Sequence, residues 1–270
     1  MDAAVAGPSD LLGEISRICD ALRERLIKFR RDIHSNPELS GEEKNTSAFV
    51  AGVLEDNDIE TRREVGGHGV VGLLRGGGPG PTIAFRADMD ALPIADTKDV
   101  DYASTVPGVM HACGHDVHTS VLMGAAVVLA GIRERLKGNV KFIFQPSEER
   151  SVTGAKLMIE DGVLDDPAPS AIVALHCFPE LPVGTIGHKS GVMTASADRF
   201  KITIKGRSGH ASRPHQTVDA VLLAALAINA IHHIVSRRTD PLHHAVISIG
   251  TICGGDAPNI IADTVVMEGT

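Results

Sequence analysis

Three short apolar segments, each followed at once by polar residues, constrain the fold more than any other feature of this sequence. They cover residues 82–88, 140–144 and 171–175, and helical patterns lie between them. Strands that alternate with helices predict an α/β domain with a mostly parallel mixed sheet flanked by helices. Functional sites in such sheets form at the carboxyl ends of the strands. We therefore expect the polar residues after these segments to meet at one edge of the sheet.

Apolar residues that recur at steps of three and four predict the helices. The first helix is expected over residues 12–33, and the second around residues 49–54. A buried helix is expected over residues 120–136 and is closed by Gly138, because glycine commonly follows the last turn of a helix. A shorter helix begins at Gly154.

The pattern changes after about residue 187, where alternating apolar and polar residues indicate half-exposed strands. A strand, a helix and two strands are expected in turn, over residues 200–205, 218–235, 244–252 and 264–268. This order predicts the start of a ferredoxin-like α+β unit. We therefore divide the chain into domains at residues 1–186 and 187–270. Because the sequence stops inside an expected strand, we expect it to be a C-terminally incomplete piece of a longer protein.

Composition and charge limit the possible partners. Apolar residues make up 43% and charged residues 22%, as in soluble globular proteins. A formal net charge of -8 without a basic block argues against nucleic acid. The longest apolar run, over residues 120–132, is too short to cross a bilayer, so no membrane partner is expected. Four scattered cysteines form no disulfide framework, and a cytoplasmic location is expected.

The segment of residues 110–119 contains three histidines, a cysteine and an aspartate. Cys113 and His115 are two residues apart, so in an extended or looped chain their side chains point the same way and can share a metal ion. Glu149 and His176, which follow the other strands, can add a carboxylate and an imidazole. Such a ligand set suits zinc, and also manganese, cobalt or nickel. Alone, Cys113 and His115 would be better explained as a buried apolar residue and a loop residue.

Two acidic pairs follow the first two strands. One member of the pair Glu148 and Glu149 can bind metal while the other acts as general base toward a metal-bound water. Alone, such a pair is more often a solvated feature of a helix N-terminus. Asp88 and Asp90 can orient a ligating imidazole, or can simply form a turn at the strand end. His118 is expected to cap or pack the next helix.

In the second domain, two polar loops carry candidate substrate contacts. His210 can reach a substrate oxyanion, and Asn259 can donate or accept a hydrogen bond. The alternative for His210 is an ordinary histidine of a surface turn. The residues by themselves do not decide between these interpretations.

Five motifs occur in a consistent order, at residues 86–93, 111–116, 145–149, 175–176 and 258–259. In these motifs the chain resembles the M20 family of metallopeptidases. The similarity is to the cysteine-ligand amidohydrolase branch, with hippurate hydrolases, N-acyl-amino-acid amidohydrolases and auxin-conjugate hydrolases. It runs from about residue 29 to the end and is more specific for family than for substrate.

The resemblance implies a site for two divalent metal ions, zinc or manganese first, with cobalt or nickel as alternatives. Cys113 would bridge both ions. His115 and His176 would complete the coordination of one ion, and Glu149 would serve the other.

The resemblance also implies an activity, the metal-dependent hydrolysis of N-acyl amino acids to a carboxylate and an amino acid. Glu148 would be the general base toward a metal-bound water, and Asp88 is placed with it among the catalytic residues. The second domain would be a lid that forms a homodimer. His210 would contact the substrate in the partner subunit's site, and Asn259 would bind the substrate.

Two departures from the family pattern bear on function. Arg86 stands where much of the superfamily has a metal-binding histidine, and His115 takes over that role in the cysteine branch. The family's last ligand, a histidine near the C-terminus, lies beyond this sequence. One alternative is therefore a truncated, non-catalytic metal-binding or dimerising protein, against which the presence of Glu148 argues. Another is a cysteine hydrolase with Cys113 as nucleophile, sensitive to alkylation but not to chelators.

Overall fold

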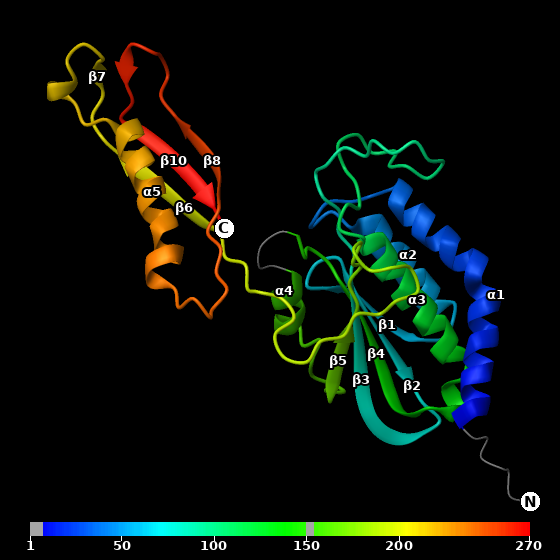
Figure 1. The fold of residues 1–270 in the computed structure, drawn as a ribbon. Helices are drawn as coiled ribbons and strands as arrows, with labels where there is room; N and C mark the ends of the chain where they lie inside the picture. Colours follow the sequence, from blue (N-terminus) through cyan, green and yellow to red (C-terminus); the bar gives the residue numbers. More distant parts are fainter. Residues whose placement is uncertain (1–7, 150–153) are drawn as a thin grey trace, which may run out of the picture. The chain divides into compact units, whose positions relative to one another are not determined.

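The computed structural model describes residues 8–149 and 154–270, which form two compact units, Met1–Gly184 and Thr185–Thr270 (Figure 1). The elements of the first unit are α1 Pro8–Ser35, α2 Lys44–Glu55, β1 Glu60–Val65, β2 Gly69–Arg75, β3 Gly78–Asp88, α3 His115–Gly131, β4 Lys137–Gln145, α4 Gly154–Glu160 and β5 Ala171–Ala174. Those of the second unit are β6 Phe200–Lys205, β7 Gly209–His210, α5 Ala220–Arg238, β8 Ile249–Gly254, β9 Ile260–Ile261 and β10 Thr264–Gly269.

The sheet of the first unit is mixed, in the order β1-β2-β4-β3-β5. Strand β3 runs parallel to both β4 and β5, whereas β2 is antiparallel to β1 and β4. In register, Asp88 pairs with Gln145 and Arg86 pairs with Ala174. The carboxyl ends of β3, β4 and β5 therefore lie at one edge, and the predicted α/β fold with a mixed sheet and flanking helices is confirmed. Strand β1 was not predicted.

Both faces of this sheet are covered by helices (Figure 1). Phe142 and Phe144 are fully buried on the face that carries α1, α2 and α3. Ile143, between them, points to the opposite face and packs with Met158 of α4. Burial of each phenylalanine contributes about 2–3 kcal/mol, which holds β4 in place beneath the site.

The helix predicted over residues 120–136 is shifted in the structure, so those predicted bounds are wrong. Helix α3 begins at His115, after Gly114 with φ 84°, and ends at Gly131. A Cβ atom at Gly114 would lie 3.1 Å from Cys177 Cβ, so the turn needs glycine for space and for conformation. Gly138 does not end the helix. It lies in β4, where a Cβ atom would meet the Pro81 carbonyl oxygen at 2.0 Å.

The second unit has an antiparallel sheet in the order β6-β10-β8. Helix α5 packs on it through Ala220 and Ala224, which contact the cluster containing Val265 and Met267. The strand, helix and two strands that were predicted are all present, but the bounds predicted as 244–252 are wrong, because that strand begins at Ile249 and ends at Gly254. By length and composition alone α5 could cross a membrane, with a hydropathy of 1.5, but one such helix is weak support for a membrane protein.

Candidate metal centre

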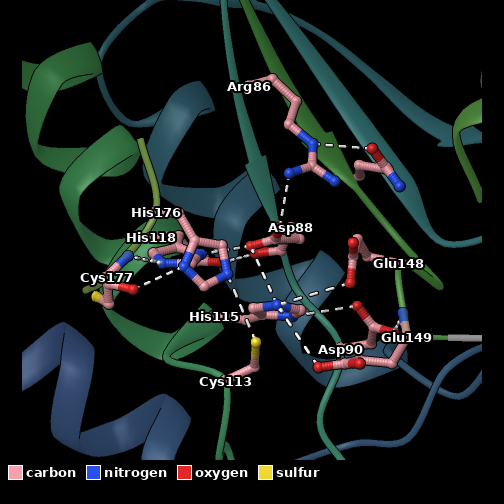
Figure 2. Close-up of polar contacts among 12 residues, drawn as sticks. Arg86, Asp88, Asp90, Cys113, His115, His118, Glu148, Glu149, His176 and Cys177 are labelled. Carbon is pink, nitrogen blue, oxygen red and sulfur yellow. Dashed lines mark hydrogen bonds and ion pairs between the residues drawn. The ribbon is translucent and has the colours of Figure 1, made fainter. Parts of the chain in front are cut away.

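Polar side chains from separate segments of the first unit converge at the carboxyl edge of the sheet (Figure 2). One comes from the end of β3, two from the loop after β4, one from the loop after β5, and two from the loop before α3 and that helix's first turn. They are Asp88, Glu148, Glu149, His176, Cys113 and His115. All six were named from the sequence, and the structure brings them together.

The ring of His115 lies at the centre of this group and is 1% exposed. Its Nε2 atom is 3.7 Å from Asp88 Oδ1 and 3.9 Å from one oxygen of each of Glu148 and Glu149. Its Nδ1 atom is 3.3 Å from Asp90 Oδ1. Within the described residues neither ring nitrogen has a hydrogen-bond partner of good geometry, which is costly for a buried polar group.

These separations suit a cation between the groups. Two nitrogen or oxygen ligands, each about 2.1 Å from an ion, lie at most about 4.2 Å apart. Burial alone would lower the pKa of His115, but Asp90, Asp88 and Glu149 raise that pKa. The cluster therefore favours positive charge at this position.

Cys113 and His176 form the second part of the centre. The Sγ atom of Cys113 is 3.5 Å from His176 Nε2. His176 Nδ1 lies 2.7 Å from the carbonyl oxygen of Cys177, which can only accept, so Nδ1 donates and the neutral ring presents its Nε2 lone pair to the sulfur. Tetrahedral zinc, with bonds of about 2.3 Å to sulfur and about 2.0 Å to nitrogen, would place these atoms about 3.5 Å apart.

His118 is within ligand distance of Asp88 and His115, yet both of its ring nitrogens are occupied. Its Nε2 atom accepts the backbone N–H of Cys177 at 2.8 Å, so Nδ1 carries the hydrogen and donates to Asp88 Oδ1 at 2.6 Å. His118 thus positions Asp88 and the chain after β5, in line with the predicted packing role.

The environment of Cys113 is unsuitable for a nucleophilic cysteine. Burial raises the pKa of this thiol to about 12, and the carboxylates of Glu149, Glu148 and Asp88 add to the effect. Reactive cysteines instead lie in electropositive surroundings that stabilise the thiolate. The site therefore disfavours the cysteine-hydrolase alternative.

The carboxyls of Asp88 and Glu148 differ in their proton affinity. Burial alone would raise the pKa of Asp88, but the hydrogen bond from His118 and the charges of His115 and Arg86 hold it well below its usual range. Burial raises the pKa of Glu148, and the neighbouring Asp88 opposes its ionisation further. Glu148 is also the more accessible, with 42% of its side chain exposed. Asp88 is therefore a fixed anion, and Glu148 is the better group to exchange protons.

His210, at the end of β7, and Asn259, just before β9, lie close together in the second unit, where β7 and β9 form a short antiparallel pair. His210 pairs with Ile260, and the Ala211 N–H donates to the Asn259 carbonyl at 3.0 Å. His210 Nδ1 accepts the Ser212 N–H at 3.2 Å, so its exposed Nε2–H is left as a donor. The structure brings these two predicted residues together, in a different unit from the metal-type residues.

The residues that hold the start of α3 were not predicted from the sequence. Asp116 Oδ2 accepts from Arg30 Nε and from His34 Nδ1, both at 2.7 Å. Both donors come from the last turns of α1 and precede Asp116 in the chain by 86 and 82 positions, respectively. The only signal that could have identified Asp116 is that a polar side chain on this helix is buried. Burial arises from tertiary packing, so the sequence alone does not show it.

We expect Asp116→Ala to lower the free energy of unfolding by about 3 kcal/mol, because the change removes the carboxylate that pairs with the buried His34 and the partly buried Arg30 of α1. Urea unfolding followed by circular dichroism measures the loss. The matched control is Asp32→Ala, which removes an exposed ion pair between Asp32 and Lys28 of α1. This change should lower the free energy of unfolding by less than about 1 kcal/mol. Equal losses for the two variants would contradict a buried tie between α1 and α3.

The model of peptidase family M20/M25/M40 matches residues 84–267. The chain belongs to this family. It is 45% identical to an N-acetyl-L-cysteine deacetylase of Bacillus subtilis, over 92% of this chain and 59% of the relative. It is 40% identical to an N-acyl-L-amino acid amidohydrolase of Geobacillus stearothermophilus, over 95% of this chain and 69% of the relative.

A solved M20 structure shows the same fold. The Bacillus subtilis YXEP protein, a dinuclear metal binding peptidase, is 42% identical and superposes with a TM-score of 0.72, over 93% of this chain and 64% of that one. The chain spans 59% to 66% of the length of three curated relatives that it matches at 45% to 46% identity.

Proposed function

We propose that this protein is a metal-dependent amidohydrolase that cleaves the amide bond of N-acyl amino acids. The observation that carries the proposal is the buried ring of His115, surrounded by carboxylates at 3.7–3.9 Å and lacking a well-formed hydrogen bond in the described chain. The deacetylase and amidohydrolase relatives support the substrate class, since both are named for N-acyl amino acids.

The residues present fit a metal centre, as the donor set and the distances above indicate. By analogy with the dinuclear YXEP protein, the site would hold two metal ions. Their ligands would be Cys113, His115, Glu149 and His176. Zinc or manganese is proposed first, with cobalt or nickel as alternatives. Bound divalent ions would supply Lewis acidity, which polarises a carbonyl and lowers the pKa of water.

The protein's own groups would move the proton. Glu148 would accept a proton from the attacking water and pass it to the leaving nitrogen, so that the C–N bond breaks to a carboxylate and an amine. Asp88, held by His118 at 2.6 Å and Arg86 at 2.6 Å, would stay ionised and keep a negative charge beside His115.

The second unit would act as a lid and as the contact of a homodimer in the cytoplasm. His210, as an Nε2–H donor, would contact the oxyanion, and Asn259 beside it would bind the substrate. Exposed apolar residues on α5, including Leu222 and Leu226, support a partner on this face.

Elemental analysis of the natural protein, combined with hydrolysis of a panel of N-acyl amino acids, tests the proposal. We expect bound divalent metal and release of free amino acid, both removed by a chelator and restored by added metal. Iodoacetamide treatment of the metal-loaded enzyme serves as the comparison. A protein without metal and without hydrolysis, or one that alkylation inactivates while chelation does not, would refute the amidohydrolase.

A further inference from the structure

Glu43, just before α2, is a fully buried carboxylate that the chemistry above does not use. Its Oε1 atom accepts the Ser147 N–H at 2.7 Å and lies 3.4 Å from Ser147 Oγ. Its Oε2 atom accepts the Gly41 N–H at 2.9 Å. Burial of a carboxylate is unfavourable unless its oxygens are hydrogen-bonded. The hydrogen bond from Ser147 joins Glu43 to the loop after β4, which is distant in the sequence.

That loop needs an external support. Ser147 has φ 53°, in the left-handed region that a residue with a side chain rarely adopts. It directly precedes Glu148 and Glu149, so its backbone conformation sets the direction in which both side chains leave the loop. The Ser147 N–H points into the protein and is held by a carboxylate 104 positions earlier in the chain.

A second carboxylate supports the next part of the same loop. Asp90 Oδ2 accepts the Glu149 N–H at 2.9 Å and the Ser40 hydroxyl at 2.6 Å. The segment of residues 40–43 thus reaches the loop twice, through Glu43 directly and through Asp90 from Ser40. Because Asp90 also lies 3.3 Å from His115 Nδ1, this arrangement connects the loop to the centre of the site.

We propose that Glu43 is a positioning residue of the active site, which holds Ser147 in its left-handed conformation so that Glu148 and Glu149 face His115. The proposal rests on the proposed function for its kinetic consequences. Its structural content, that Glu43 orders this loop, stands on the hydrogen bonds alone.

Glu43→Ala and Glu43→Gln test the proposal, because the amide keeps one oxygen acceptor where alanine keeps none. Glu38→Ala is the matched control. Glu38 is also a carboxylate of the segment before α2, but it accepts from Asn45 and Thr46 of α2 itself at 2.8–3.0 Å. Its removal should disturb the helix start to a similar extent without touching the loop after β4.

Three measurements apply to each variant of the natural protein. Hydrogen exchange of the Ser147 and Glu149 amides in metal-free protein reports loop order, and titration with zinc or manganese reports metal affinity. Steady-state kinetics separate kcat from KM.

For Glu43→Ala we expect exchange at Ser147 to accelerate at least tenfold, and metal affinity or kcat to fall roughly 10- to 100-fold with KM nearly unchanged. Glu43→Gln should recover part of each loss.

Glu38→Ala should lower the thermal midpoint but leave Ser147 exchange and kcat as in the unmodified protein. Unchanged Ser147 exchange in both Glu43 variants, or equal exchange and kinetic effects in Glu38→Ala, would overturn the positioning role. If Glu43→Ala fails to fold, the contrast between Glu43→Gln and Glu38→Ala decides. A protein that binds no metal and hydrolyses nothing would instead refute the proposed function, while the exchange contrast still decides whether Glu43 orders the loop.

Discussion

Replacement of Glu148 by glutamine is expected to reduce kcat by about 1000-fold, because general acid–base catalysis contributes roughly 10²–10⁴-fold. Glutamine has the same shape as glutamate but cannot accept a proton. Glu148 is 42% exposed and is 3.9 Å from His115 Nε2, so the substitution should not disturb the buried part of the site. Metal content should therefore stay at the level of the unmodified protein. The amino acid released from an N-acyl substrate and the metal per chain are the two measurements.

The matched control for this substitution is Glu160→Gln on α4. Its carboxylate is also largely exposed and lies 3.8 Å from Lys156, away from the candidate ligands. Its kcat should equal that of the unmodified enzyme. Turnover by Glu148→Gln at more than a tenth of the normal rate would remove Glu148 from the role of general base, and loss of metal in that variant would make it a ligand instead.

Cys113→Ala is expected to weaken metal binding more than any other single substitution in this site. Loss of a group that only orients a ligand costs roughly 10- to 100-fold in affinity, so loss of Cys113, in its proposed role as a ligand shared by two ions, should exceed 100-fold. Elemental analysis after dialysis measures the loss directly. The fold should remain, because Cys113 is only partly buried and does not belong to the hydrophobic core clusters of the described residues.

Cys177→Ala is the control for this experiment. Cys177 is equally part-buried and lies beside the same histidines, but its contacts to His118 and His176 are made by backbone atoms that alanine retains. Its metal content should be unchanged. If Cys113→Ala and Cys177→Ala bind metal equally well, Cys113 is not a ligand.

The position of the candidate site followed from local sequence patterns, and the reason is geometric. Strands β3, β4 and β5 are parallel neighbours, so residues just beyond their ends must lie at a common edge. Asp88, Glu149 and His176 could be assigned to that edge without knowledge of any side-chain contact. The start of α3 could not be predicted in the same way. It depends on Gly114 and on the contacts of Asp116 with α1, which link residues more than 80 positions apart.

The sequence by itself determined the fold class, the edge of the sheet that carries the candidate site, and the chemical types of its candidate ligands. Periodicity and strand ends are properties of a few consecutive residues, which explains why they can be read locally. Only the tertiary structure decided which nitrogen of His118 and His176 carries hydrogen, because that depends on backbone groups of another segment. It also decided that Glu43 supports the loop of Glu148, since burial and long-range hydrogen bonds arise only when distant segments pack together.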